Sequence, residues 1–260
     1  MKNISKIIIL SIALTMLAIS SGCYLYREPS MVRNVETVSG DNMVYLVWDR
    51  NSDSNIDYYR IYRSPTPSGE YRLIAETHYC DYYDYGVYNG VTYFYAISAV
   101  NIHGTEGPLT DYLIYDTPRP EGYYATMADM DYYPEHAGWD FSAFHNCDMS
   151  SSSCDIYYDY YQGTGYLVCA DNYTDIQDMG YCYNFDDVTY APEYGWSPSG
   201  EEIVTCGHIY VIWTRDNHFA KIYIRDYDSY EILFDWAYQL DPGNRELGIS
   251  AGKIVSSHQR

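Results

Sequence analysis

Short strand-length segments, separated by turn-forming clusters, constrain the fold of this chain more than any other feature of its sequence. Each is rich in Tyr, Val and Ile, which are good strand residues. No long stretch repeats its apolar residues every 3.6 positions, so few helices are expected. The segments predict an all-β chain, with candidate strands at residues 43–48, 58–63, 71–75, 92–100, 156–161, 166–170, 179–183, 208–214, 219–226 and 232–238.

The candidate strands fall into two groups, and the chain between them reads as a linker. Residues 116–122 are "DTPRPEG", with two prolines and a glycine. We therefore expect a first domain at 29–118, a second β-rich, sandwich-like domain at 119–248 and a frayed polar tail at 249–260.

The first group resembles a fibronectin type III domain over residues 29 to about 118. The matching stretches are "VYLVWD", "YYRIYRS" at 58–64 and "YDYGVYNGVTYFYAISAVN" at 83–101. Leu46 and Trp48 share one face of their strand, and Tyr95 and Ile97 share one face of theirs, so two inner faces can pack as a sandwich. The resemblance implies that the Tyr93 hydroxyl ties its strand to a neighbouring loop, and that the domain acts as a spacer or interaction platform.

The amino terminus reads as a secretory signal. Lys2 and Lys6 precede an apolar run at 7–19, which is short for a membrane span. The following "SSGC" resembles the lipobox of bacterial lipoproteins, apart from Ser20, where that family usually has Leu. The resemblance implies a signal peptide at 1–22, lipidation of Cys23 and a tether at 23–28.

The residue after the lipidation site bears on location. Tyr24 stands where an Asp would favour retention in the inner membrane, so the resemblance to lipoproteins implies a cell-envelope protein of the outer membrane. The alternative is an ordinary signal peptide that happens to end near a cysteine.

The net charge of the chain limits the classes of molecule that it is expected to bind. Loss of Lys2 and Lys6 with the signal peptide changes the formal charge from −21 to −23. Such a polyanion is repelled by phosphate backbones and anionic lipid, which argues against nucleic-acid binding and against a basic membrane patch. Cationic partners and divalent cations are the compatible ones. With 47% hydrophobic residues, the chain has the composition of a protein that buries a core.

Residues 207–226, "GHIYVIWTRDNHFAKIYIRD", gather two histidines and several charged residues. A two-residue turn at 216–217 would pair Arg215 with His218 and form a hairpin with one buried side. That register places the two histidines far apart and on opposite faces, so they could not ligate one ion. The faces would then be Ile209, Val211, Trp213, Ala220, Ile222 and Ile224 inward, and His208, Tyr210, Thr214, Phe219, Lys221, Tyr223 and Arg225 outward.

An even number of cysteines follows Cys23, which is typical of disulfides in an exported chain. We expect local pairs of Cys147 with Cys154 and of Cys169 with Cys182. Cys80 and Cys206 then remain, either bridging the domains or reduced. A zinc site is the alternative, although the sequence has no Cys-x-x-Cys spacing.

Other chemistry has weaker signals. The sequence has no Gly-x-Ser-x-Gly, His-Glu-x-x-His or phosphate-binding glycine loop. With 36 acidic residues, pairs of carboxylates suited to a glycosidase arise by chance. Acid clusters at 128–136 and 171–178 offer oxygens to calcium but lack the spacing of an EF-hand loop, and solvated loops are the simpler interpretation. We expect no bound cofactor, with calcium as the alternative.

The aromatic content allows ligand binding. Tyr-rich surfaces are adaptable in recognition and can stack on sugar rings, although alternating Tyr is also an ordinary strand residue. The stretches "YVIWTRDNHFAKIYI" and "FDWAYQ" resemble haemophore-like haem-binding envelope lipoproteins, which implies a β-rich fold there.

Together these features predict a lipid-anchored, non-catalytic binding or structural protein with a protein or glycan ligand. The alternatives are a carbohydrate-active or other hydrolase, or a haem- or metal-binding envelope lipoprotein, in each case through the second domain.

Overall fold

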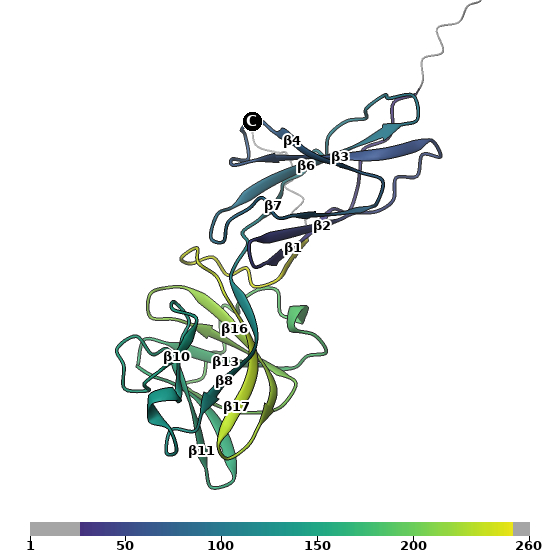
Figure 1. Ribbon diagram of the computed structural model, residues 1–260. Helices are drawn as coiled ribbons and strands as arrows, with labels where there is room; N and C mark the ends of the chain where they lie inside the picture. The colour runs from purple at the N-terminus through teal and green to yellow at the C-terminus, as the bar shows by residue number, and fades with distance from the viewer. Residues whose placement is uncertain (1–26, 252–260) are drawn as a thin grey trace, which may run out of the picture.

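A computed structural model describes residues 27–251, which form two β-sandwiches (Figure 1). The prediction of an all-β chain is confirmed, and the only helices among the described residues are two 3-10 turns, η1 (Pro134–His136) and η2 (Phe185–Asp187). Cys23 and the whole signal segment lie outside the described residues, as do residues 252–260.

The first sandwich has the two-sheet arrangement expected of a fibronectin type III-like domain. One sheet has the order β18-β1-β2-β5 and the other β4-β3-β6-β7. The strands are β1 (Glu36–Gly40), β2 (Met43–Val47), β3 (Ile56–Ser64), β4 (Arg72–Thr77), β5 (Asp81–Asp84), β6 (Tyr93–Asn101), β7 (Ile114–Asp116) and β18 (Ile249–Ala251).

The inner faces of this sandwich are those expected from the sequence. Leu46, Trp48, Tyr95 and Ile97 are buried in one apolar cluster between the sheets. The Tyr93 hydroxyl accepts a hydrogen bond from the backbone N–H of Tyr88 at 3.1 Å, which confirms its role in tying strand to loop.

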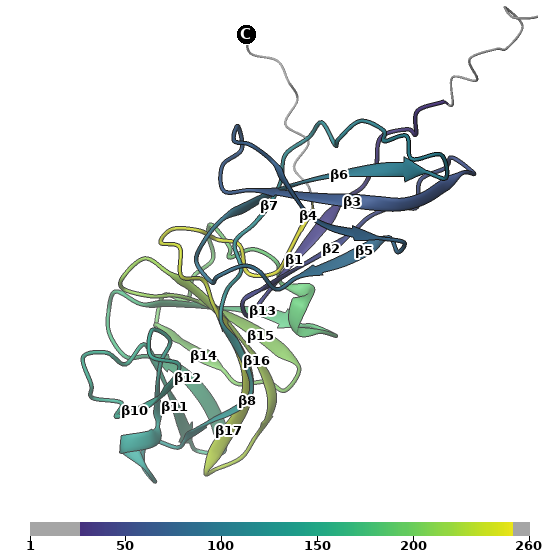
Figure 2. The same cartoon turned by 45° about the horizontal axis from the view of Figure 1, so that its top comes forward.

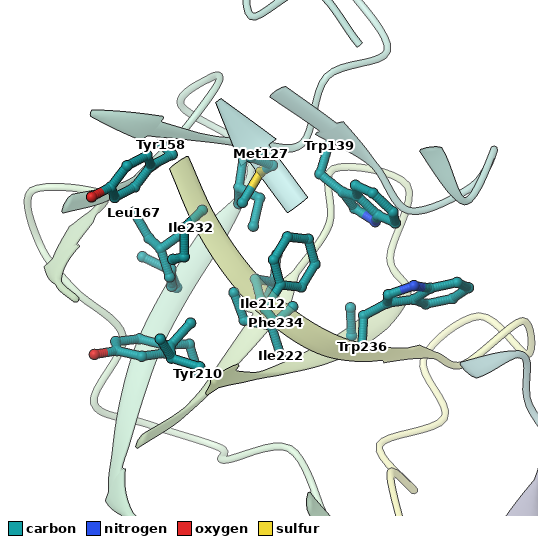
Figure 3. Packing of buried hydrophobic residues seen from close by; sticks show 14 of the residues in the cluster. Met127, Trp139, Tyr158, Leu167, Tyr210, Ile212, Ile222, Ile232, Phe234 and Trp236 are labelled. Atoms are coloured by element: carbon teal, nitrogen blue, oxygen red, sulfur yellow. The ribbon is translucent and has the colours of Figure 1, made fainter. Parts of the chain in front are cut away.

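The second sandwich packs two five-stranded sheets, β10-β9-β11-β12-β14 and β13-β15-β16-β17-β8, around a central core (Figure 2). Figure 3 shows Ile222, Phe234 and Trp236 of one sheet facing Trp139 and Tyr158 of the other. The strands are β8 (Glu121–Ala128), β9 (Gly138–Asp140), β10 (His145–Cys147), β11 (Ile156–Tyr161), β12 (Thr164–Cys169), β13 (Asp175–Tyr181), β14 (Glu201–Ile203), β15 (His208–Trp213), β16 (Phe219–Tyr227) and β17 (Glu231–Tyr238).

The hairpin of β15 and β16 exists, but its predicted register is wrong by one residue. Trp213 pairs with Phe219, so residues 214–218 form the connection. The Thr214 N–H donates to the His218 carbonyl at 2.9 Å, and Asn217 adopts a φ of 67°. A longer loop with one left-handed residue replaces the two-residue turn, because Asn tolerates that conformation.

The shift in register changes which side chains face the core. Tyr210 and Ile212 now share the central core with Ile222, whereas Trp213 is 36% exposed. The other face is also buried, because residues 182–191 and 247 pack over it. The prediction of a hairpin with one buried side is therefore wrong.

Lys221, expected on the solvent side, is fully buried under that cover. Its ammonium donates to the carbonyls of Phe185 at 2.7 Å and Val188 at 3.1 Å, and lies 4.2 Å from the Phe185 ring centroid. Burial is the main cause that lowers the pKa of Lys221 to about 7. The lysine thus holds the η2 segment against the sheet.

The segment predicted to be a linker, residues 116–122, is not exposed to solvent along its whole length. Residues 117–120 are buried between β7 and β8. The guanidinium of Arg119 donates to Glu121 Oε2 at 2.8 Å and to the Leu247 carbonyl at 2.6 Å, and the Arg119 N–H donates to the Gly40 carbonyl at 3.2 Å. These bonds join the two sandwiches through backbone and side chain.

The tail prediction also needs correction at its start. Residues 249–251 form β18, which pairs antiparallel with β1 so that Glu36 lies opposite Ala251. Backbone pairing with the first sandwich replaces the expected fraying, because the edge of β1 offers unpaired hydrogen-bonding groups.

Candidate functional site

Three tyrosines form an exposed aromatic cluster on the second sandwich. Tyr132, Tyr133 and Tyr230, here called the tip cluster, are 58%, 48% and 56% exposed. The ring centroids of Tyr132 and Tyr133 are 5.0 Å apart at 82°, and those of Tyr132 and Tyr230 are 5.1 Å apart at 71°. Edge-to-face contacts of this kind are favourable, so the rings support one another.

Asp129, at the end of β8, positions the tip cluster. Its N–H donates to the Tyr230 carbonyl at 2.7 Å, and its carbonyl accepts from the N–H groups of Tyr132 at 3.1 Å and Tyr133 at 2.9 Å. Its carboxylate is buried and accepts from the Tyr160 N–H at 2.7 Å. One residue thus connects both tyrosine segments to β11, and the rings project from a backbone that is already ordered.

The tip cluster lies at the end of the second sandwich that is remote from the first. The β16–β17 turn, which carries Tyr230, and η1, which follows Tyr133, are both at the lower end of Figure 2, opposite β1 and β2. The Asp228 carboxylate shapes that turn by accepting from the N–H groups of Tyr230 at 2.7 Å and Glu231 at 3.0 Å.

A small acid-lined cavity lies at the β16–β17 turn, the turn that carries Tyr230. Its volume is about 110 Å³, and its lining is Asp226, Tyr227, Asp228, Glu231 and Leu233. Among residues 27–251, none of these three carboxylates forms an ion pair with a lysine, arginine or histidine. The contributing segments, 121–161 and 226–234, contain neither lysine nor arginine.

A second cluster lies at the end of the β15–β16 hairpin and consists of the buried carboxylates of Asp140 and Asp155, the half-exposed carboxylate of Asp216 and the ring of His218. His218 Nδ1 lies 3.2 Å from Asp216 Oδ2. Burial is the main cause that raises the pKa of Asp155 to about 6, and the nearby charges of Asp140 and Asp216 act in the same direction. Arg215 opposes them, with its Nη2 3.8 Å from Asp155 Oδ1.

The structure places the two hairpin histidines at opposite ends of β15. His208 Nδ1 lies 2.9 Å from an Asp178 carboxylate oxygen. The side chain of His218 is only 16% exposed, and its ring lies 5.3 Å from that of Tyr238. Each histidine has its own aspartate, and the structure does not bring the pair together.

The acid clusters proposed for calcium have protein partners. The Asp171 carboxylate accepts from the N–H of Thr174 at 2.8 Å and pairs with Arg215 Nη1 at 2.8 Å. Asp129, from the other cluster, accepts hydrogen bonds from the N–H groups of Tyr132 and Tyr133 through its carbonyl and from that of Tyr160 through its carboxylate. Within residues 27–251 no group of three or more His, Cys, Asp or Glu side chains is arranged to hold a metal ion. Calcium binding stays a prediction.

The six cysteines within residues 27–251 are free thiols, and the two predicted pairs differ in their placement. Cys169 ends β12 and packs against the central core, whereas Cys182 lies in the cluster on the outside of the opposite sheet, so the predicted Cys169–Cys182 pair is wrong. Cys147 and Cys154 do lie together. The pKa of Cys154 is raised, mainly by a hydrogen bond with the Cys147 thiol and secondly by burial.

No helix within residues 27–251 is long and apolar enough to cross a membrane.

Comparison with known proteins finds similarity to solved structures. No family model and no curated protein matches the chain. A Fn3-like protein from Clostridium thermocellum is 28% identical, with 32% of this chain and 83% of that chain covered and a TM-score of 0.27. A structure described as "FN3tt mut" is 26% identical, with 35% and 97% covered and a TM-score of 0.30.

A spore cortex lytic enzyme of Clostridium perfringens, SleM, is 16% identical, with 34% of this chain and 28% of that chain covered and a TM-score of 0.29.

The tip cluster was not predicted from the sequence. Tyr132 and Tyr133 stand about a hundred residues before Tyr230. The sequence signal available was the excess of tyrosine, 35 residues in all, which does not say which of them meet.

Proposed function

We propose that this chain is a non-catalytic binding protein of the cell envelope, anchored by a lipid on Cys23, that contacts a protein or glycan ligand through the tip cluster. The observation that carries the proposal is the set of three half-exposed tyrosine rings, positioned by the backbone bonds of Asp129. Tyrosine supplies a large contact area with few rotatable bonds, so little entropy is lost when a ligand covers it.

The arrangement of the two sandwiches supports a role in presentation. The tether precedes the first sandwich in the sequence, and the β16–β17 turn, which carries Tyr230, is at the end of the second sandwich remote from β1 and β2 (Figure 1). Arg119 is bonded to both sandwiches, through its N–H to Gly40 of the first and through its guanidinium to Glu121 and Leu247 of the second, so the first would hold the second away from the membrane as a spacer. Outer-membrane location remains part of the proposal, from the residues around Cys23.

The test is a ligand screen with the mature protein on glycan and protein arrays. The variant Tyr132→Ala/Tyr133→Ala/Tyr230→Ala should lose the ligand that the wild type binds. The control replaces three other exposed tyrosines, Tyr79, Tyr173 and Tyr194, which are 75%, 80% and 80% exposed, and should retain it. Equal binding by both triple variants, with melting temperatures unchanged, would exclude the tip cluster as the binding surface.

A second candidate function, a hydrolase, is favoured by the carboxylate cluster around Asp155. Asp155, with a pKa of about 6 near ionised Asp140 and Asp216, has the raised pKa that a general acid requires. A generic hydrolase screen tests this alternative. Activity that Asp155→Asn abolishes without changing the melting temperature would replace the binding proposal with an enzymatic one.

The haem- or metal-binding alternative has its own measurement. Calorimetric titration with calcium, zinc and haem, repeated on His208→Ala and His218→Ala, would support it if one substitution removed a bound ligand while the fold stayed intact.

A further inference from the structure

The cavity at the β16–β17 turn has the size of a single side-chain head group. Its volume of about 110 Å³ is well below the roughly 300–1,000 Å³ of typical small-molecule pockets. Leu233 and Tyr227 provide an apolar wall, and Asp226, Asp228 and Glu231 provide carboxylates. An aliphatic stem with a charged end would match both parts of this lining.

The charge around this cavity is uncompensated within the described residues. The nearest basic residue in sequence, Arg225, is bound to Asp235 through its Nε at 2.8 Å and stacks on the Tyr223 ring at 4.7 Å. The segments that form the tip contain no lysine or arginine. The ring of His136 lies 6.4 Å from that of Tyr133.

The tip cluster adds a second feature that favours cations. Tyrosine faces attract lysine and arginine through their ring quadrupole, and the long stems of those side chains cover aromatic surface. The site is an open surface with one small cavity, which suits an extended protein segment better than a small molecule.

We propose that the tip binds a basic segment of a partner protein, with one lysine or arginine side chain in the cavity and its neighbours over Tyr132, Tyr133 and Tyr230. This inference rests on the proposed function and adds the chemical class of the ligand. Carboxylates and tyrosine rings act on the same cation, so the affinity should fall as the salt concentration rises.

The experiment uses the mature protein and a dye-labelled peptide of alternating glycine and lysine, followed by fluorescence anisotropy. A second peptide has every lysine acetylated, which removes the charge and keeps the length. The wild type should bind the first peptide in a saturable manner and not the second. Tyr230→Ala should weaken binding about fivefold, as expected for loss of a cation–π contact.

The cavity is tested with Asp226→Asn/Glu231→Gln, which should weaken binding about tenfold, the effect of about 1.4 kcal/mol. The matched control, Glu28→Gln/Glu70→Gln, removes the same charge from two exposed positions, one in the tether and one on the first sandwich, and should change the Kd less than about twofold. Unchanged melting temperatures show that the variants fold.

Three outcomes would overturn the inference: no saturable binding of the lysine peptide, equal binding of the acetylated one, or equal losses in the cavity and control variants. If the tyrosine triple variant loses a ligand found by array while the cavity variant keeps it, the proposed binding surface stands and the basic ligand class is wrong. If neither variant affects that ligand, the proposed function fails as well.

Discussion

Oxidation of Cys147 and Cys154 should stabilise the second sandwich. Both sulfurs lie over Gly138, where a Cβ atom would be 2.4 Å from the Cys154 Sγ and 2.9 Å from the Cys147 Sγ. The absence of a side chain on Gly138 leaves the space in which the two thiols meet. Cys154 is fully buried, so a disulfide there would be protected from solvent.

The magnitude follows from the size of the closed loop. Residues 147–154 form a loop of eight residues. The chain-entropy relation gives about 2.5 kcal/mol of stabilisation for a loop of that length. Arg215 already fixes this loop by donating to the carbonyls of Ser152 and Cys154, so bond formation needs little movement. The melting temperature of the second sandwich should rise by about 10 °C.

The assay compares mature protein treated with oxidised glutathione and with a reducing thiol. Two protein thiols lose their hydrogens to form one S–S bond, and one glutathione disulfide is reduced to two thiols. Peptide mapping after alkylation should detect a Cys147–Cys154 crosslink, and calorimetry should show the rise. Cys147→Ser/Cys154→Ser, treated identically, accounts for oxidation of the other cysteines. Failure to find the crosslink, or a crosslink that leaves the melting temperature unchanged or lower, would refute the reasoning.

Four further results are expected. Burial lowers the pKa of Lys221 from 10.5 to about 7, so between these pH values the unfolded state binds more protons than the folded state. The free energy of unfolding should therefore rise with pH across that window, by up to about 1.4 kcal/mol per pH unit. In denaturant titrations, Lys221→Met should flatten this slope. Trp48→Ala should cost about 3–5 kcal/mol and Tyr93→Phe about 1 kcal/mol in the unfolding of the first sandwich, and an unchanged transition for Trp48→Ala would contradict its burial. Ile222→Asp should remove the cooperative melting of the second sandwich by burying an unpaired charge, and persistence of that transition would contradict the observed register. Metabolic labelling with a fatty-acid analogue should mark the wild type and not Cys23→Ala, and equal labelling of both would exclude lipidation at that residue.

The β15–β16 hairpin shows what the sequence determines and what it does not. Strand positions could be predicted, because runs of Ile, Val and Tyr bounded by turn residues have few alternatives. The register could not, because residues 209–212 are apolar at four successive positions and both faces of the hairpin are buried. Without alternation, only the turn sets the register, and a shift of one residue in the register reverses the faces.

Weakly apolar strands were missed for a related reason. The sequence of β8, "EGYYATMA", has small and polar residues between its tyrosines, and it is held by pairing with β17 rather than by its own propensity. The tip cluster depends on that pairing, because Asp129 follows β8 and Tyr230 precedes β17. A site formed by residues that long-range strand pairing brings together is not marked by a short motif in the sequence.

The pairing of β18 with β1 bears on the order in which this chain can fold. Partners such as Glu36 and Ala251 stand at opposite ends of the described chain, so that part of the first sandwich has a very high contact order. Chains are made from the amino terminus, and early domains usually fold first. Here the outer edge of β1 would stay unpaired during synthesis, open to association with other chains, until β18 has been made. Because β18 follows the second sandwich in the sequence, the sheet of the first sandwich can be completed only after the second sandwich has been synthesised.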